Sequence, residues 1–161
     1  MIPVIGFAGY SNSGKTMVVS QVIKILTNRG YHVAAIKHAS HGYDVDVPGK
    51  DSWQHYQAGA EKSIVVGTDS YTIHQRCSQT PKLHDILSSI SGVDLIILEG
   101  FKTEPVPKIE VIREENNAGF LDPDEQLLGV VSDFPIELNI PVFTFEELES
   151  LVDFLLETFM Q

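Results

Sequence analysis

An eight-residue stretch near the start of the chain, GYSNSGKT from Gly9 to Thr16, restricts the fold more than any other part of the sequence. It matches the pattern G-x-x-x-x-G-K-[ST], in which successive backbone N–H groups curl around a phosphate chain. Glycine permits the positive φ angles and the close approach that such a loop needs. The stretch follows an apolar run and precedes a helical pattern, so it predicts a phosphate-binding loop between a strand and a helix.

The predicted phosphate contacts extend over the whole loop. Seven residues are assigned to phosphate binding: Gly9, Ser11, Asn12, Ser13, Gly14, Lys15 and Thr16. Asparagine at position 12 is one of the few non-glycine residues that tolerate left-handed backbone geometry. Lys15 would reach the β- and γ-phosphates as the catalytic cation, and the Thr16 hydroxyl would bind Mg²⁺.

The rest of the chain alternates strand-like and helix-like segments. We expect strands at 2–8, 32–38, 62–68, 70–76, 93–100, 107–113, 126–133 and 140–145, and helices at 16–29, 52–60, 83–90 and 145–160. The pair 62–68 and 70–76 reads as a hairpin, and the imperfect alternation of 107–113 indicates a strand near a sheet edge. This order predicts one α/β domain over 1–161, a three-layer P-loop NTPase-type fold with a mostly parallel sheet and an antiparallel edge or hairpin.

A second chemical feature is the apolar strand VDLIILEG, which ends in Glu99. A carboxylate at the end of a buried strand beside a phosphate loop supplies a second contact to Mg²⁺ or to a water molecule. Asp94 lies at the opposite end of this strand and is therefore unsuited to that role. The alternative for Glu99 is that it only caps a loop.

A polar loop follows the strand at 32–38 and should also lie at the carboxyl edge of the sheet, where open α/β folds bind ligands. Five of its residues are predicted to border the nucleotide: Lys37, His38, Asp44, Lys50 and Asp51. Asp46 is predicted to contact the metal, so the metal group is Thr16, Asp46 and Glu99. Zinc binding through His38, His41 and the two aspartates of this loop is the disfavoured alternative, because no cysteine lies nearby.

The sequence contains less evidence on how the base of the nucleotide would be recognised. The guanine-reading tetrapeptide N-K-x-D is absent from the chain. Asp133 ends a late strand, and its carboxylate could accept from N1 and N2 of guanine. The alternative is a simple turn before Pro135.

Charge and composition exclude several classes of function. The net charge is −11, and residues 82–161 carry four Lys and Arg against seventeen Asp and Glu. Nucleic acid is an unsuitable main partner, because its binding needs clustered cations. The acidic half is either a solvated surface or a docking face for a basic partner. A single cysteine, no signal-peptide pattern and no apolar run of about 20 residues favour a cytoplasmic protein without a membrane segment.

Four stretches together resemble the MobB family, the molybdopterin-guanine dinucleotide biosynthesis protein B. They are GYSNSGKT, KHASHGYDVDVPGKDSWQHYQAGA, LIILEGFK and EPVPKIEVIR, which occur in the family's order. The resemblance implies a P-loop fold, homodimerisation, and binding of GTP and Mg²⁺ with at most slow hydrolysis. It also implies a role beside the guanylyltransferase MobA, which joins GMP to molybdopterin, and raises direct molybdopterin binding as a further expectation. Asn12 is a departure, since members of the family often have glycine there.

Two further classes of function compete with a GTP-binding accessory protein. A small-molecule kinase would need cations over the transferred phosphoryl group, usually from an arginine-rich lid, but the chain has only three arginines. A nucleotide-gated interaction module would need no turnover. For hydrolysis, the available groups are His38, Asp46 and Glu99, without an arginine finger, so we expect slow turnover.

Overall fold

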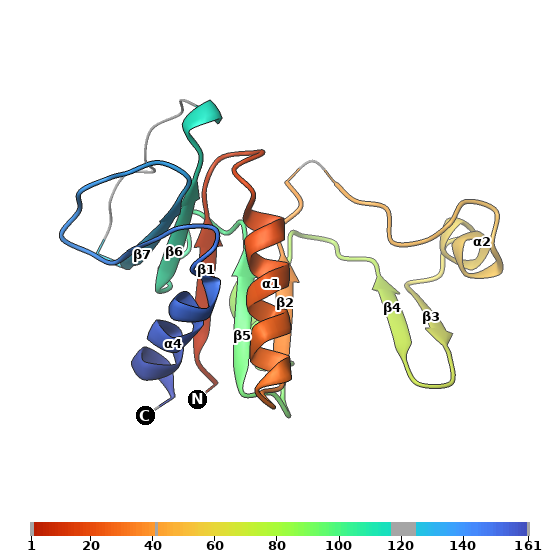
Figure 1. Ribbon diagram of the computed structural model, residues 1–161. Coiled ribbons are helices and arrows are strands. Elements are labelled where there is room, and N and C mark those ends of the chain that lie inside the picture. Colours follow the sequence, from red (N-terminus) through yellow and green to blue (C-terminus); the bar gives the residue numbers. More distant parts are fainter. Residues whose placement is uncertain (1, 41, 117–124, 161) are drawn as a thin grey trace. The chain divides into compact units, whose positions relative to one another are not determined.

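The computed structural model describes residues 2–40, 42–116 and 125–160 (Figure 1). Contacts within the chain divide it into two compact units. The first, here called the sheet unit, comprises Met1–His38 and Ile90–Gln161. The second, the hairpin unit, comprises Ala39–Ser89.

The sheet unit is built on a six-stranded sheet with the strand order β2-β5-β1-β6-β7-β8. The strands are β1 (Val4–Ala8), β2 (Val33–Lys37), β5 (Leu95–Glu99), β6 (Lys108–Ile112), β7 (Leu127–Ser132) and β8 (Val142–Phe143). Every neighbouring pair is parallel. The carboxyl ends of all six strands therefore lie at one edge, and the loops that follow them can meet there.

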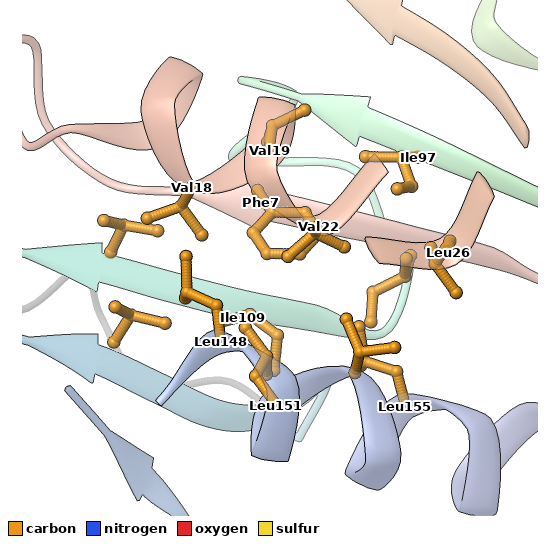
Figure 2. Packing of buried hydrophobic residues seen from close by; sticks show 14 of the residues in the cluster. Phe7, Val18, Val19, Val22, Leu26, Ile97, Ile109, Leu148, Leu151 and Leu155 are labelled. Atoms are coloured by element: carbon orange, nitrogen blue, oxygen red, sulfur yellow. The ribbon is translucent and has the colours of Figure 1, made fainter. Parts of the chain in front are cut away.

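Two α-helices cover one face of this sheet, α1 (Lys15–Asn28) and α4 (Leu148–Phe159) (Figure 1). Val18, Val22 and Leu26 repeat every four residues, so they form one buried stripe on α1. They pack with Leu151 of α4 and with Phe7 of β1 in one hydrophobic core (Figure 2). This core fixes the start of α1 against the end of β1, and thus fixes the loop between them.

The hairpin unit contains α2 (Asp51–Gln57), β3 (Lys62–Val66), β4 (Tyr71–Gln75) and α3 (Leu83–Ser88). Strands β3 and β4 are antiparallel, as the sequence predicts. Helix α2 packs on one face of the pair: the Ser63 hydroxyl donates to the Ser52 carbonyl oxygen at 3.0 Å, and the rings of Tyr56 and His74 stack at 3.7 Å. The predicted fold class, a mostly parallel α/β sheet with an antiparallel hairpin, is confirmed.

One predicted strand position is wrong. The strand expected near a sheet edge is β6, which lies inside the sheet between β1 and β7 with all five residues buried. Lys108 and Glu110 alternate with apolar residues along this strand, yet they are 5% and 1% exposed. The Lys108 ammonium donates to the carbonyl oxygens of Lys102 and Glu104 at 3.1 and 3.2 Å, and these bonds offset part of the cost of burying its charge.

The predicted loop after β6 begins with a 3₁₀ turn, Glu114–Asn116, and residues 117–124 lie outside the described part of the chain. In the part that the structure describes, no helix has both the length and the apolar character needed to cross a membrane.

Candidate functional site

The loop between β1 and α1 has the backbone geometry that its glycines predict. Gly9, Asn12 and Gly14 have φ angles of 140°, 64° and 89°. Asn12 is the one non-glycine residue with positive φ in the described chain. A Cβ atom on Gly9 would lie 2.3 Å from the Val111 carbonyl oxygen, so only glycine fits there. Together these angles turn the chain sharply from the end of β1 into the first turn of α1.

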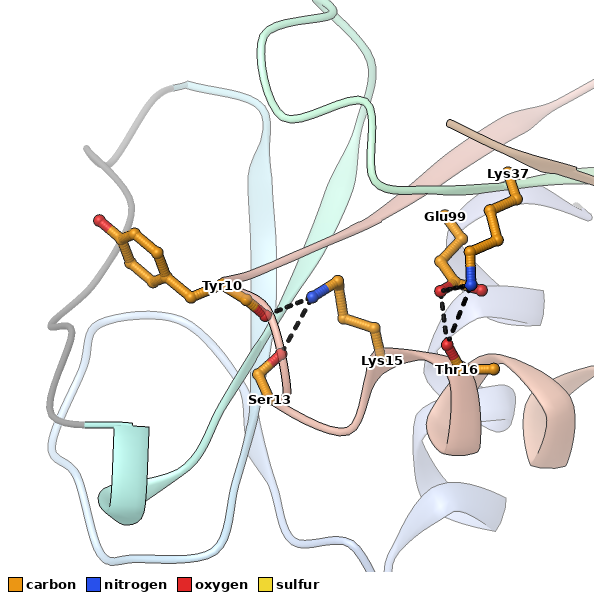
Figure 3. A network of polar contacts seen from close by, with 6 residues as sticks. All are labelled: Tyr10, Ser13, Lys15, Thr16, Lys37 and Glu99. Atoms are coloured by element: carbon orange, nitrogen blue, oxygen red, sulfur yellow. Dashed lines mark hydrogen bonds and ion pairs between the residues drawn. The ribbon is translucent and has the colours of Figure 1, made fainter. Parts of the chain in front are cut away.

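Lys15 lies over this loop (Figure 3). Its ammonium donates to the carbonyl oxygen of Tyr10 and to the Ser13 hydroxyl, the latter at 3.3 Å. Partial burial lowers the pKa of Lys15, and the nearby ammonium groups of Lys102 and Lys37 lower it further, against the opposing effect of Glu99. An anion at the loop would relieve this repulsion, which is the electrostatic condition for phosphate binding.

Beside the loop, the structure brings Thr16 and Glu99 together, as predicted (Figure 3). The Thr16 hydroxyl donates to Oε1 of Glu99 at 2.6 Å, and the Glu99 side chain is only 12% exposed. Lys37 completes the group, because its Nζ lies 3.1 Å from the same carboxylate oxygen. Lys37 and Glu99 meet because they are register partners at the ends of the adjacent parallel strands β2 and β5.

The chemistry of this group suits a hard divalent cation. The Thr16 hydroxyl, in the first turn of α1, and the Glu99 carboxylate, at the end of β5, are oxygen ligands of the kind that Mg²⁺ prefers. The predicted third member, Asp46, lies in the hairpin unit, where its Oδ1 accepts a hydrogen bond from the Val47 amide at 2.8 Å. Among residues 2–40, 42–116 and 125–160, no group of three or more His, Cys, Asp or Glu side chains is arranged so that it could hold a metal ion. The contact of Asp46 with a metal stays a prediction.

The predicted nucleotide-bordering residues fall into both units. Lys37 and His38 belong to the sheet unit, where the His38 amide donates to the Glu99 carbonyl oxygen at 2.9 Å. The His38 ring lies 5.2 Å from that of Phe101. The other three belong to the hairpin unit: Asp44, Lys50 and Asp51. Their approach to a nucleotide stays a prediction, and His41 lies outside the described residues.

The structure places Asp51 at the start of α2. Helix α2 begins at Asp51, so its N-cap is Lys50, which makes no side-chain capping bond. Asp51 instead lies in the first turn, where a negative charge favours the positive end of the helix dipole.

Asp133 follows β7 at the same sheet edge as the phosphate loop. Its Oδ1 accepts from the Glu114 amide at 2.9 Å, and its Oδ2 lies 3.9 Å from Nη1 of Arg113. Its role in base recognition stays a prediction. Arg113 is not among the residues predicted for the site, although its position after a strand next to β1 is a signal that could have pointed to it.

Comparisons with known proteins agree with this geometry. Residues 4–133 match the family described as Molybdopterin guanine dinucleotide synthesis protein B, MobB. The chain belongs to this family. The resemblance seen in the sequence is thereby confirmed, and it extends through the loops that end β1, β5, β6 and β7.

Two relatives are similar to this chain over most of their length. The molybdopterin-guanine dinucleotide biosynthesis adapter protein of Haemophilus influenzae is 33% identical over 96% of this chain and 88% of its own. The adapter protein of the same name from Escherichia coli is 36% identical over 98% and 93%.

Solved structures show the same fold. A crystal structure of molybdopterin-guanine biosynthesis protein B has a TM-score of 0.77 and 26% identity, covering 96% of this chain and 99% of the other. The MobB homologue from Bacillus stearothermophilus has a TM-score of 0.76 over 98% and 97%, with 24% identity. The six-stranded parallel sheet with its P-loop is thus the MobB fold.

Proposed function

We propose that this chain is a GTP-binding adapter protein of molybdenum cofactor biosynthesis, which assists the attachment of GMP to molybdopterin. The observation that carries the proposal is the convergence of the phosphate loop with the Thr16–Glu99 pair at one sheet edge, in a member of the MobB family. The names of the Haemophilus influenzae and Escherichia coli relatives support the adapter role.

Different residues of the site would bind different parts of Mg-GTP. Backbone N–H groups from Gly9 to Thr16 and the Lys15 ammonium would bind the β- and γ-phosphates. Thr16 and Glu99 would hold Mg²⁺, which supplies charge neutralisation to the phosphates. Lys37 pairs with Glu99 at 3.1 Å and is 60% exposed, so its ammonium can turn toward the γ-phosphate when the carboxylate binds a cation.

Turnover by the chain alone should be slow. Arg29 lies at the carboxyl end of α1 and is held by Glu149 and, at 2.6 Å, by Asp153, far from the loop. Arg76 belongs to the hairpin unit, where its guanidinium lies 4.1 Å from the Tyr56 ring centre. Arg113 lies against Gly14, but on the side of β1 opposite to Glu99, with its guanidinium over the Phe145 ring. None of the three arginines is thus assigned to the γ-phosphate, and hydrolysis should fall well below the ~1 s⁻¹ or more of arginine-assisted enzymes.

A small-molecule kinase is not favoured for a related reason. A kinase holds the transferred phosphoryl group with positive charges, usually arginines from a lid. The chain has three arginines, and the single arginine of residues 82–161, Arg113, lies against Gly14 rather than in a lid.

Assembly is the second part of the proposal. One face of the hairpin carries four exposed apolar side chains, Ile64, Val66, Tyr71 and Ile73. They form the cross-strand pairs Ile64–Ile73 and Val66–Tyr71, on the face opposite to the one that α2 covers. We propose that two chains associate through this face into a homodimer in the cytoplasm. The two units would act as one nucleotide-binding domain over 1–161, and the protein would work beside a MobA-type guanylyltransferase and molybdopterin.

Reconstitution tests the function directly. A MobA-type guanylyltransferase, molybdopterin and Mg-GTP are combined with and without this protein, and the guanine dinucleotide product is quantified. Wild type should raise the yield and Lys15→Ala should not, whereas Lys24→Ala, which removes an exposed lysine from the same helix, should act like wild type. Equal stimulation by wild type and Lys15→Ala would contradict a nucleotide-dependent role.

A further inference from the structure

We propose that Arg113 is a positioning residue for the nucleoside end of the bound nucleotide, where its guanidinium gives the base a surface to stack on and holds Asp133 in place. The inference rests on the proposed function, because it needs GTP at the phosphate loop. It adds a residue and a chemical role that neither the phosphate loop nor the metal group supplies.

The first observation is the distance between Arg113 and the phosphate loop. A Cβ atom built on Gly14, the residue before α1, would lie 3.1 Å from Nε and 3.3 Å from Nη2 of Arg113. The guanidinium therefore lies directly against the last turn of the loop. This contact crosses about a hundred positions of sequence, and it is made because Arg113 follows β6, the strand beside β1.

The second observation is that two further loops meet the same guanidinium. Its Cζ lies 4.5 Å from the centre of the Phe145 ring, and its Nη1 lies 3.9 Å from Oδ2 of Asp133. Phe145 follows β8 and Asp133 follows β7, so the loops after three successive strands converge on Arg113. Phe145 also reaches the loop itself, with Cε1 3.1 Å from the same Cβ position on Gly14.

The third observation is the direction in which a nucleotide must run. The metal-binding pair and Lys37 lie at the ends of β5 and β2, on one side of β1. With the γ-phosphate and the metal on that side, the ribose and base extend over the other side, toward the ends of β6, β7 and β8. A base that reaches for Asp133 then passes over the group that Arg113 and Phe145 form.

The chemistry of a guanidinium suits this position. Its plane stacks on aromatic faces, and Phe145 already supports one side of it. Base stacking on such a plane contributes to affinity without hydrogen-bond readout. Arg113 is 34% exposed, so its other face can be reached, and its positive charge, 3.9 Å from Oδ2, favours the present position of the Asp133 carboxylate.

Calorimetric titrations of the full chain with Mg²⁺ and three ligands test the role of Arg113. The ligands are GTP, ITP, which lacks the guanine N2 amino group, and inorganic tripolyphosphate, which lacks the nucleoside. In Arg113→Ala, the GTP affinity should fall by about tenfold or more, which is the range of one lost stacking contact. The tripolyphosphate affinity should change less than about twofold, because the phosphate loop is intact. The preference for GTP over ITP should shrink as Asp133 loses its support.

Arg29→Ala is the matched control, since it removes an arginine of similar exposure, 31%, from the other end of α1. It should leave all three affinities unchanged. Arg113→Lys keeps the positive charge but lacks the planar guanidinium, so it should recover less than half of the GTP affinity that Arg113→Ala loses. Phe145→Leu, a second variant that keeps the arginine, should weaken GTP in the same selective way.

Two results would overturn the inference. One is a GTP affinity of folded Arg113→Ala within twofold of wild type, and the other is an equal loss of GTP and tripolyphosphate affinity. If Arg113→Ala does not fold, an unchanged GTP affinity in Phe145→Leu overturns it. Failure of the proposed function looks different, because wild-type protein would then bind neither GTP nor tripolyphosphate.

Discussion

Glu99 is the residue on which the metal contribution depends. Its carboxylate is mostly buried and is reached by the Thr16 hydroxyl at 2.6 Å and the Lys37 ammonium at 3.1 Å. A buried polar group needs such hydrogen-bond partners. The Glu99 carboxylate therefore lies beside the phosphate loop, where a divalent cation can join it to the nucleotide.

Replacing Glu99 with Gln should remove the dependence of GTP binding on Mg²⁺. In wild type, affinity should be higher with Mg²⁺ than with a chelator, and in the variant this ratio should fall by about tenfold, because a neutral amide is a much weaker cation ligand. Asp94→Asn is the control at the opposite end of the same strand, where the Asp94 carboxylate accepts from the His32 amide at 2.7 Å. Titrations with and without Mg²⁺ measure both ratios. A variant that keeps the wild-type ratio would exclude Glu99 from the metal site.

Lys15 should give the free protein a characteristic pH dependence. Burial and the charges of Lys102 and Lys37 lower its pKa in the folded state, whereas the unfolded chain holds that proton up to the ordinary value of 10.5. Its charge therefore destabilises the fold below the lowered pKa, and this destabilisation is relieved as pH rises toward 10.5. Wild type should gain stability relative to Lys15→Met over that window, as measured by urea unfolding. If the stability of wild type relative to Lys15→Met instead falls as pH rises, the fold stabilises the Lys15 ammonium.

At the scale of elements, the connection from β1 to α1 positions the site. Its geometry depends on close packing of the loop against β6, where a Cβ atom on Gly9 would come 2.3 Å from the Val111 carbonyl oxygen and 2.9 Å from the Ser13 hydroxyl. The Val111 backbone cannot move away from Gly9 without shifting β6, a strand inside the sheet. The loop therefore packs directly on the sheet, and a change that distorts the loop should also destabilise the sheet.

Gly9→Ala should therefore destabilise the protein by roughly 2–4 kcal/mol through overpacking and strain. Gly30→Ala is the matched control, because Gly30 also has a positive φ, 90°, but has nothing within 4 Å of the added Cβ. It should cost only about 1 kcal/mol for the unfavourable backbone angle. Denaturant unfolding measures both losses, and equal losses would show that contact with β6 does not constrain the loop.

Features encoded in local sequence could be predicted, and features that depend on packing could not. The phosphate loop, the hairpin and the pairing of Thr16 with a strand-ending acid follow from short patterns. The interior position of β6 could not be predicted, because charged residues such as Lys108 and Glu110 are typical of exposed positions, and here they are buried by neighbouring strands and loops. Arg113 shows the same limit, since its partners come from the phosphate loop and from the segments after β7 and β8.

At the scale of the whole molecule, the exposed face of the hairpin bears on assembly. Val66 and Tyr71 are 77% and 70% exposed and directly paired across the strands. Apolar patches of this kind mark interaction surfaces more often than isolated apolar residues do. A two-fold dimer that buries the same face on both chains would remove the patch from water.

Sedimentation at micromolar concentration tests this assembly. Wild type should sediment as a dimer, and Ile73→Glu should be monomeric, because burying an unpaired carboxylate in the interface is costly. Thr72→Glu places the same charge on the neighbouring exposed residue of β4, which points to the opposite face, and it should remain dimeric. A wild-type monomer, or a dimer that survives Ile73→Glu, would rule out this interface.

GTP binding through the phosphate loop is measured by calorimetric titration of GTP and ATP, each with Mg²⁺, into wild type and Lys15→Ala. Wild type should bind GTP more tightly than ATP, and a Lys15→Ala protein that remains folded should lose this binding. Preference for ATP, or unchanged GTP affinity in the folded variant, would show that the loop is not a GTP site.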